Sequence, residues 1–308
     1  MSNQGQKHKV LVILGTTASG KTGLGVALAR QFDGEIVSAD SRQVYRGLNV
    51  GSGKDLQKYG NIKYHLIGIA DPKEIFSVAE YQKKAFAAID DILQRGKLPI
   101  IVGGSGQYLE AVVENYQLSD IKPDMAVRAE NENRDAEELF AELKLKNLAF
   151  ALKLNNSDKN NKRRLIRYLE VVNHSKPGVQ SQKPGALPYD FLLLSLTWPK
   201  EVLAERIHRR LIERLEKEGL IQEVSDLNDK TGLSWERLES FGLEYKFIAR
   251  YLQEKIDYEQ MAELLERAIN QFAKKQMTWF KRWGKKRKIN WLIDKGEAKK
   301  MVKDFLGK

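Results

Sequence analysis

Residues 9–22 read KVLVILGTTASGKT, an apolar run followed by a glycine-bounded loop and a lysine–threonine pair. The run 9–14 is short and rich in β-branched residues, which predicts a strand buried on both faces of a parallel sheet. Residues 22–32 then place apolar side chains at helical spacing. A loop of the form G-x-x-x-x-G-K-[ST] between a strand and a helix is typical of polyphosphate binding.

This loop provides the first candidate site residues. They are Gly15, Thr16, Thr17, Ala18, Ser19, Gly20, Lys21 and Thr22. Glycines let backbone N–H groups turn inward around an anion, and the helix N-terminus adds a partial positive charge. Lys21 offers a positive charge to phosphate oxygens, and the Thr22 hydroxyl is a candidate ligand for Mg²⁺. We therefore expect a diphosphate or triphosphate in this loop.

The flanking sequence predicts an α/β fold with a P-loop NTPase-like parallel sheet. Further strands are expected at 35–39, 64–69, 98–102 and 191–196, and a helix at 77–95. Strands that alternate with helices form right-handed βαβ units. The polar segment 120–185, with helices expected at 135–145 and 163–172, is interpreted as a mostly helical insertion between two parts of the core, 1–119 and 186–308. Everything after Pro199 is expected to be helical, including a long helix at 258–283.

The sequence has no acidic residue where a phosphate-transferring enzyme needs one. Strand 98–102 ends in Gly103-Gly104-Ser105, whereas nucleotide kinases and ATPases place a magnesium-binding Asp at such a strand end. The carboxylate that ends a core strand early in the chain is Asp40. Its position fits a general base or a metal ligand, and it equally fits a cap for the next helix.

Composition narrows the function classes. The chain of 308 residues contains no cysteine, which excludes disulfides, thiolate zinc sites and cysteine nucleophiles. We expect no signal peptide and no membrane span, and hence a cytoplasmic protein. The net charge of +11 favours a polyanionic partner, although a solubilising surface is the alternative. Residues 273–290 carry eight Lys/Arg and no Asp/Glu, interleaved with Trp279, Phe280 and Trp283, which suits RNA, with core packing as the alternative for the aromatic rings.

Several separated segments, in the same order, resemble the tRNA dimethylallyltransferase (tRNA isopentenyltransferase) family of the bacterial type. They are GTTASGKT (15–22), SADSRQVY (38–45), DP (71–72), FSV (76–78), VGGSGQYL (102–109), RLIR (164–167), LEV (169–171) and FAKKQMTWF (272–280). The resemblance covers nearly the whole chain. It implies transfer of a dimethylallyl group from dimethylallyl diphosphate to N6 of adenosine 37 in the anticodon stem-loop of tRNA, with Mg²⁺ and by a monomer.

The resemblance also assigns roles to residues. Asp40 would be the catalytic base, with Lys21 and Ser105 as further catalytic groups. The tRNA contacts that it implies are Asp40, Ser41, Arg42, Gln43, Ser105, Arg128, Arg163, Arg164, Leu165, Ile166 and Arg167. For some of these a simpler role remains open: Ser105 as a helix cap, and the arginines as a solvated helix face.

Two departures leave further questions open. The family has an Ile-Gly-Tyr-Lys-Glu-like segment before its last long helix, where this chain reads SFGLEYK (240–246), so no role is assigned there. The insertion diverges from the family and is slightly short. The alternative functions are isopentenyl transfer to a free nucleotide, a nucleotide kinase, and a non-catalytic nucleic-acid binder. The basic C-terminal stretch and the arginines of the insertion favour tRNA.

Overall fold

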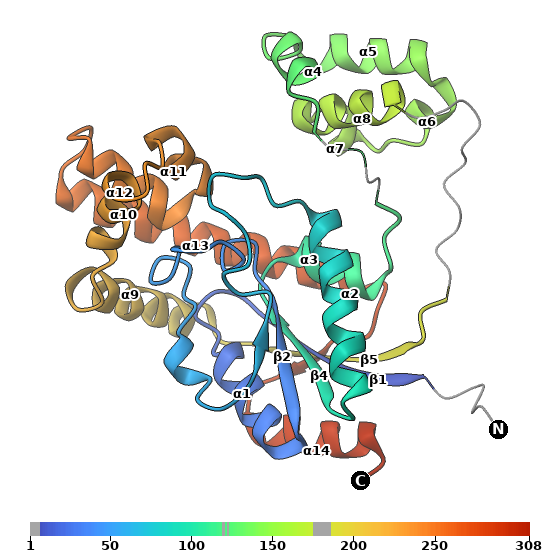
Figure 1. Cartoon of the computed structure of the whole chain (residues 1–308), viewed down its shortest axis with the longest axis vertical. Helices are drawn as coiled ribbons and strands as arrows, with labels where there is room; N and C mark the ends of the chain where they lie inside the picture. Colours follow the sequence, from blue (N-terminus) through green and yellow to red (C-terminus); the bar gives the residue numbers. More distant parts are fainter. Residues whose placement is uncertain (1–6, 119–120, 122, 175–185) are drawn as a thin grey trace. The chain divides into compact units, whose positions relative to one another are not determined.

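A parallel sheet lies at the centre of the larger of two units in the computed structural model, which describes residues 7–118, 121, 123–174 and 186–308 (Figure 1). The strands are β1 (His8–Leu14), β2 (Gly34–Ala39), β3 (Tyr64–His65), β4 (Leu98–Gly103), β5 (Tyr189–Leu196) and β6 (Asn290–Leu292). Their order is β3-β2-β4-β1-β5-β6, and each neighbouring pair is parallel. The predicted α/β class is confirmed.

Helices cover both faces of this sheet because its strands are apolar on both sides. On one face, Leu11 and Ile13 pack against α1 and α14; on the other, Val10 and Val12 pack in the core to which α2, α3 and α9–α13 contribute. These helices are α1 (Lys21–Phe32), α2 (Val78–Gln94), α3 (Gly106–Val113), α9 (Lys200–Glu216), α10 (Leu220–Asp229), α11 (Trp235–Phe241), α12 (Leu243–Leu252), α13 (Tyr258–Trp283) and α14 (Lys295–Leu306). A 3₁₀ turn, η1 (Leu56–Lys58), precedes β3.

Local sequence explains where the longer helices begin. Ser77 and Glu80 form a reciprocal capping box at the start of α2, and Asp257 and Gln260 form another at the start of α13. Each box satisfies backbone N–H groups that have no partner within the helix. The expected helices at 77–95 and 258–283 are therefore found with nearly the predicted bounds.

Two expectations about strands are wrong. The strand expected at 64–69 ends after His65, because Leu66 and Gly68 have φ of 63° and 64°, which turns the chain out of the extended conformation. The region after Pro199 is not wholly helical, since Asn290–Leu292 forms β6 and pairs with β5. β6 is too short to show a clear alternation of apolar and polar residues.

The smaller unit comprises the described residues of Gln117–Pro184 and has a hydrophobic core of its own. Its helices are α4 (Met125–Glu130), α5 (Ala136–Lys146), α6 (Leu148–Leu152), α7 (Asn156–Lys159) and α8 (Lys162–His174). Leu139 and Leu143 of α5 pack against Leu165 and Leu169 of α8. The remaining described residues, on either side of it in sequence, belong to the unit that contains the sheet.

Candidate active site

The loop after β1 has the backbone conformation of an anion nest. Ala18 and Gly20 lie in the left-handed region, with φ of 58° and 92°. Where left-handed and right-handed backbone conformations alternate, successive N–H groups point toward one position. A Cβ at Gly15 would approach the Ser19 Oγ to 2.7 Å, so a side chain here would displace that hydroxyl. The loop then enters α1, whose N-terminus adds partial positive charge.

Two side chains from the chain after β5, Trp198 in the connection to α9 and Arg206 in α9, bind carbonyl oxygens of the loop. The Arg206 Nε donates to the Ala18 carbonyl at 2.8 Å, and the Trp198 Nε1 donates to the Ser19 carbonyl at 2.8 Å. The Arg206 guanidinium also lies 4.7 Å from the Trp198 ring centroid. The N–H groups of Thr17 and Ser19 already have acceptors, the Gln276 Oε1 and the Thr16 carbonyl. The remaining N–H groups at the start of α1 are available to phosphate oxygens.

Lys21 is poised as a cation in this loop. Its Nζ donates to the Thr16 carbonyl at 3.2 Å. Burial lowers the pKa of Lys21 to about 8; the charge of Asp40 opposes this shift, and that of Arg210 adds to it. The amine is thus mostly charged at neutral pH, and a bound anion would raise its pKa again.

Asp40 and Lys21 lie on either side of the tip of β4, where Gly103 and Gly104 allow close packing of the neighbouring groups. β4 lies between β2 and β1, so the tip of β4 separates Asp40 from the phosphate loop. A Cβ at Gly103 would lie 2.1 Å from the Ala39 carbonyl oxygen, and one at Gly104 would lie 3.5 Å from the Lys21 Nζ. Hence an acidic residue at this strand end would not fit without displacement, and Asp40, Lys21 and Thr22 line one polar cavity.

The Asp40 carboxylate is half engaged by the backbone. Its Oδ1 accepts the N–H groups of Arg42 at 2.9 Å and Gln43 at 3.3 Å, whereas Oδ2 accepts no hydrogen bond from the described residues. The segment after Asp40 forms turns rather than a helix. The capping role therefore applies to a turn and uses one oxygen, while the other has no partner among the described residues.

Ser105 joins this group by a contact with the neighbouring loop. Its Oγ accepts the Ser41 N–H at 3.0 Å, and the Ser41 hydroxyl lies 3.4 Å from it. Ser105 occupies the N-cap position of α3, yet its side chain makes no capping hydrogen bond. The simpler role of helix cap is therefore wrong for its side chain.

The side chains of Arg42 and Gln43 are held inside the larger unit. The Arg42 Nε donates to the Phe241 carbonyl at 2.7 Å. The Gln43 Nε2 donates to the Gly53 carbonyl at 2.9 Å, and its Oε1 accepts the Ser38 hydroxyl at 2.9 Å. Both residues still line the cavity. They shape its wall in this structure, and Ser41 is the exposed member of the segment.

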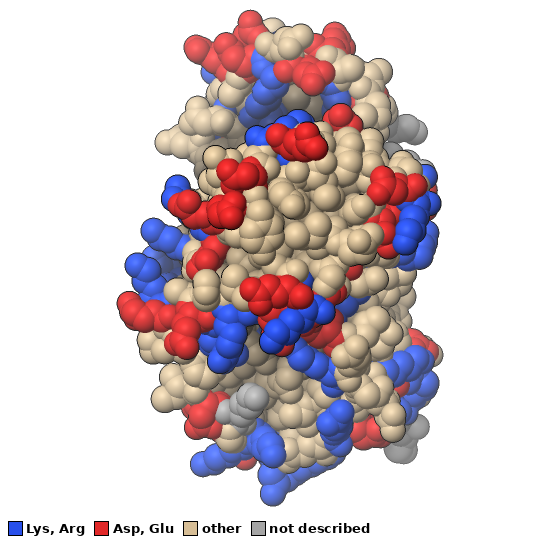
Figure 2. Space-filling view, turned by 90° about the vertical axis from the view of Figure 1, so that its left-hand side faces the viewer, with Lys and Arg blue, Asp and Glu red and all other residues tan. Residues whose placement is uncertain are grey.

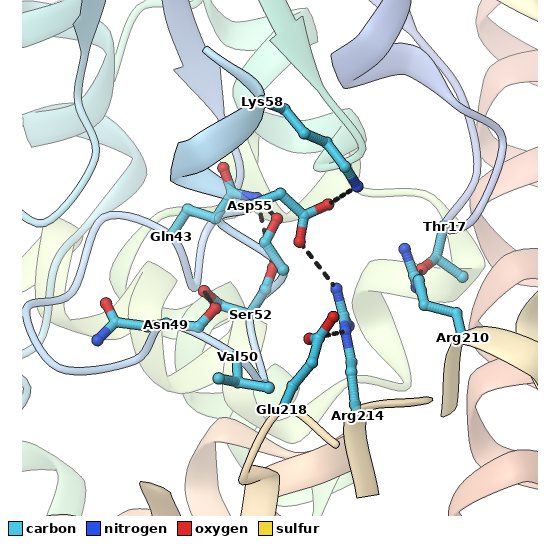
Figure 3. A network of polar contacts seen from close by, with 12 residues as sticks. Thr17, Gln43, Asn49, Val50, Ser52, Asp55, Lys58, Arg210, Arg214 and Glu218 are labelled. Atoms are coloured by element: carbon cyan, nitrogen blue, oxygen red, sulfur yellow. Dashed lines mark hydrogen bonds and ion pairs between the residues drawn. The ribbon is translucent and has the colours of Figure 1, made fainter. Parts of the chain in front are cut away.

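Two arginines of α9 complete the cationic side of the cavity (Figure 3). Arg210 donates to the Thr17 hydroxyl. Arg214 is 4% exposed and lies 3.6 Å from the Asp55 carboxylate, which also contacts Lys58 at 2.6 Å. Burial and the charge of Arg214 lower the pKa of Arg210 to about 10, so Arg210 remains charged at neutral pH.

The sequence reasoning did not find these arginines, although a signal was present. Arg206, Arg210 and Arg214 recur every four residues along α9, which places them on one face of the helix. The cavity is lined by Thr17, Lys21, Thr22, Asp40, Arg42, Gln43, Gly51, Ser52, Gly53, Asp55, Arg210, Arg214, Leu243, Glu244, Phe272 and Gln276. Besides the two arginines, those from Gly51 to Asp55 and from Leu243 to Gln276 also had no assigned role. Leu243 and Glu244 belong to the segment that departs from the family pattern.

The donor atoms in the cavity suit a hard cation such as Mg²⁺. Thr22 and Asp40 line it together, and the Thr22 hydroxyl makes no hydrogen bond to the described residues. Hydroxyl and carboxylate oxygens are ligands that Mg²⁺ prefers. Within the described ranges, no group of three or more His, Cys, Asp or Glu side chains could hold a metal. A cation here would therefore depend on phosphate oxygens for much of its coordination.

The candidate RNA-contacting residues of the smaller unit are mostly engaged in ion pairs. Glu170, fully buried, contacts the Arg128 Nε at 2.7 Å and Arg167 at 2.8 Å. Burial opposes ionisation of Glu170, but the hydrogen bonds from both arginines outweigh it and lower its pKa. Arg164 contacts Asp158 at 2.5 Å, and Arg163 is exposed.

Leu165 and Ile166 require a correction. Their side chains are 0% and 8% exposed and belong to the hydrophobic core of the smaller unit. The expectation that they contact tRNA is therefore wrong for their side chains. They pack α8 against α5 and so fix the helix that carries the arginines.

The basic stretch near the C-terminus exposes most of its basic side chains and buries two of its three aromatic rings, while Trp279 is half-buried. Phe280 and Trp283 are 0% and 2% exposed, so the alternative role of core packing applies to them. The exposed basic side chains are Lys274, Lys275, Lys281, Arg282, Lys285, Lys286 and Lys288.

Figure 2 shows a face, on the side of α9–α12 in Figure 1, where acidic and basic side chains are interspersed.

Comparison with known proteins decides the family. The family model described as "IPP transferase" matches residues 43–283. The chain belongs to this family. A relative named tRNA dimethylallyltransferase 2, from Treponema denticola, is 43% identical over 295 residues, which cover 93% of this chain and 96% of the relative.

Among the described helices, none has both the length and the apolar composition that crossing a bilayer requires.

Solved structures of IPP transferases share the fold. The full-length tRNA isopentenylpyrophosphate transferase of Bacillus halodurans is 33% identical, with a TM-score of 0.70 over 98% of this chain and 96% of that one. A eukaryotic dimethylallyltransferase captured acting on tRNA is 28% identical, with a TM-score of 0.72 over 88% of this chain and 69% of that one. The resemblance inferred from the separated motifs is thus confirmed.

Proposed function

We propose that this protein transfers the dimethylallyl group of dimethylallyl diphosphate to N6 of adenosine 37 in tRNA. The observation that carries the proposal is the arrangement of Asp40 and Lys21 on either side of the side-chain-free tip of β4. An anion nest on one side and a carboxylate on the other suit a reaction in which a diphosphate leaves and an amine loses a proton. The names of the relatives agree with this chemistry.

In the proposed reaction the allylic C–O bond breaks and a C–N bond to N6 forms. The loop N–H groups, Lys21 and Arg210 stabilise the negative charge of the departing diphosphate. The Asp40 carboxylate accepts the N6 proton through Oδ2, while the N–H groups of Arg42 and Gln43 hold Oδ1 in place. Mg²⁺, held by Thr22 and the diphosphate, would neutralise further charge on the leaving group.

Asp40 and Lys21 line a cavity, which a base stacked between its neighbours in the RNA cannot enter. The target base must therefore leave its stack to reach them. Ser41 and Ser105, whose hydroxyl oxygens lie 3.4 Å apart, are the proposed contacts to the nucleotide beside Asp40. The exposed lysines of α13 and the following turn, together with Arg163, are the proposed contacts to RNA phosphates.

The decisive experiment supplies Mg²⁺, dimethylallyl diphosphate and either unmodified tRNA with adenosine at position 37 or free AMP. We expect the mass of the tRNA to rise by one dimethylallyl group, with pyrophosphate released, and AMP to remain unmodified. Transfer to AMP but not to tRNA would overturn the proposal in favour of a free-nucleotide enzyme. Omitting Mg²⁺ or replacing it by Ca²⁺ tests the metal.

Asp40→Asn is the sharpest variant for the base. The amide can still accept the two backbone N–H groups through Oδ1, so the turn should fold, but it cannot take up a proton. We expect kcat to fall about 100-fold or more, the usual range for loss of a general base. The matched control is Asp33→Asn, because Asp33 precedes β2 and so lies at the other end of this strand from Asp40. We expect this control to leave kcat unchanged. A decrease in kcat of less than tenfold for Asp40→Asn would refute the assignment.

We also propose that the protein works as a monomer in the cytoplasm. The large basic surplus suits direct RNA binding by one chain. Sedimentation of the protein with and without tRNA would test this, since a dimer bound to one tRNA would contradict it.

A further inference from the structure

Gln276 is a polar residue in the apolar stripe of the longest helix. The buried residues of α13 are Met261, Leu265, Ile269, Ala273, Gln276, Phe280 and Trp283. They recur every three or four residues, which is the pattern of a helix face packed on a core. Gln276 is 7% exposed, and burying an amide costs free energy unless its polar atoms find partners. Its presence here therefore requires an explanation.

Both ends of the Gln276 amide bind backbone groups of the active site. Its Oε1 accepts the Thr17 N–H at 2.8 Å, and its Nε2 donates to the Gly104 carbonyl at 2.8 Å. Thr17 belongs to the phosphate loop, and Gly104 precedes Ser105. A Cβ at Gly104 would lie 2.5 Å from the Nε2, so the glycine allows this close approach.

The contacts of Gln276 extend to the carboxylate side of the cavity. Ser105 is the residue after Gly104, and its Oγ accepts the Ser41 N–H beside Asp40. One side chain thus links the loop that carries Lys21 to the loop that is hydrogen-bonded to the Asp40 segment. Because one partner is a donor and the other an acceptor, an amide of this length serves both, whereas a carboxylate or a thioether cannot.

We propose that Gln276 is a positioning residue that sets the separation between the phosphate loop and the Ser105–Asp40 side of the cavity. It touches no reacting atom and acts through Thr17 and Gly104. The inference rests on the proposed prenyl transfer, which requires the allylic carbon, held by the diphosphate, to lie within reach of an amine held beside Asp40. An error of about 1 Å in such a separation lowers rates by about 100-fold.

The test uses the full chain with Gln276→Met and Gln276→Glu. The methionine variant keeps the length and removes both hydrogen bonds, and the glutamate variant keeps the acceptor for Thr17 but loses the donor to Gly104. Gln94→Met, at the exposed end of α2, is the matched control. For each protein we would measure kcat, the KM for tRNA, the stoichiometry of Mg²⁺–pyrophosphate binding, and the urea midpoint of unfolding.

We expect both Gln276 variants to bind one pyrophosphate per chain and to keep a KM for tRNA within about threefold of the unmodified protein, while kcat falls by about 100-fold. A merely structural role would instead lower the binding stoichiometry and the urea midpoint in proportion to activity, and this would overturn the inference. So would a kcat within threefold for either variant. Failure of the unmodified protein to modify tRNA would count against the proposed function instead.

Discussion

Lys21 should impose an alkaline limit on catalysis that an arginine removes. Burial lowers the pKa of Lys21 to about 8 in the ligand-free protein. At that value about nine-tenths of the chains carry a charged Lys21 at pH 7 and about one-tenth at pH 9. If the charged form is needed to capture the diphosphate, kcat/KM for dimethylallyl diphosphate should fall about tenfold between these pH values.

The same ionisation of Lys21 changes the free energy of unfolding in the opposite direction from kcat/KM. The folded pKa of about 8 lies below the ordinary value of 10.5, so the unfolded chain binds more protons between these limits. The free energy of unfolding of the ligand-free protein should therefore rise with pH across this window, with respect to Lys21. Catalytic capture and stability thus change in opposite directions as the pH rises.

The assay is the pH dependence of kcat/KM at saturating tRNA for the unmodified protein and for Lys21→Arg. An arginine stays charged throughout the range, so its profile should be flat from pH 7 to 9, whatever its absolute rate. The last ionisation of a phosphate group, near pH 6, lies below the window and does not interfere. An alkaline decline that persists in Lys21→Arg, or one with an apparent pKa above about 9.5 in the unmodified protein, would refute the reasoning.

Two further predictions concern charge. Arg210→Met should raise the KM for dimethylallyl diphosphate by at least about tenfold, because it removes a half-buried cation beside Thr17. Arg209→Met, on the exposed side of α9, should leave this KM unchanged in steady-state kinetics. Equal KM values for the two variants would contradict this. Hydrogen bonds from Arg95 lower the pKa of the Glu35 carboxyl group from 4.5 to about 2, although burial acts in the opposite direction. Glu35→Gln should therefore lower the free energy of unfolding in urea at pH 7 by about 2 kcal/mol, and the difference should shrink as the pH falls from 4.5 toward 2; a difference independent of pH would contradict this.

Local sequence was sufficient to predict the α/β core. The apolar run 9–14, the glycines and lysine of 15–22 and the capping box at Ser77 act over a few residues, so their structures follow from neighbours in the chain. The same holds for Asp40 at the end of a strand. β6 could not be predicted, because three residues gain their strand conformation from pairing with β5 and not from a pattern of their own.

The candidate site was only partly visible in the sequence. Lys21 of the phosphate loop and Asp40 are 19 positions apart in the chain, and the resemblance of two separate segments to one family linked them to one chemistry. Arg210, Arg214 and Gln276 lie far along the chain and carry no short motif that points to phosphate. Leu165 and Ile166 show the reverse error, since residues matched to an RNA-contacting segment proved to be core.

The sequence alone determined that a polyphosphate loop exists, that an acid ends β2, and that the tip of β4 bears none. Only the tertiary structure decided that these three facts belong to one cavity, because the parallel strand order places the tip of β4 between Asp40 and the phosphate loop, and its glycines allow their close approach. It also decided which side chains complete the cavity, since α9 brings Arg210 and Arg214, and α13 brings Gln276, to it through packing on the sheet core. Packing joins residues by their position in space, and a linear pattern of residue types records only their position along the chain.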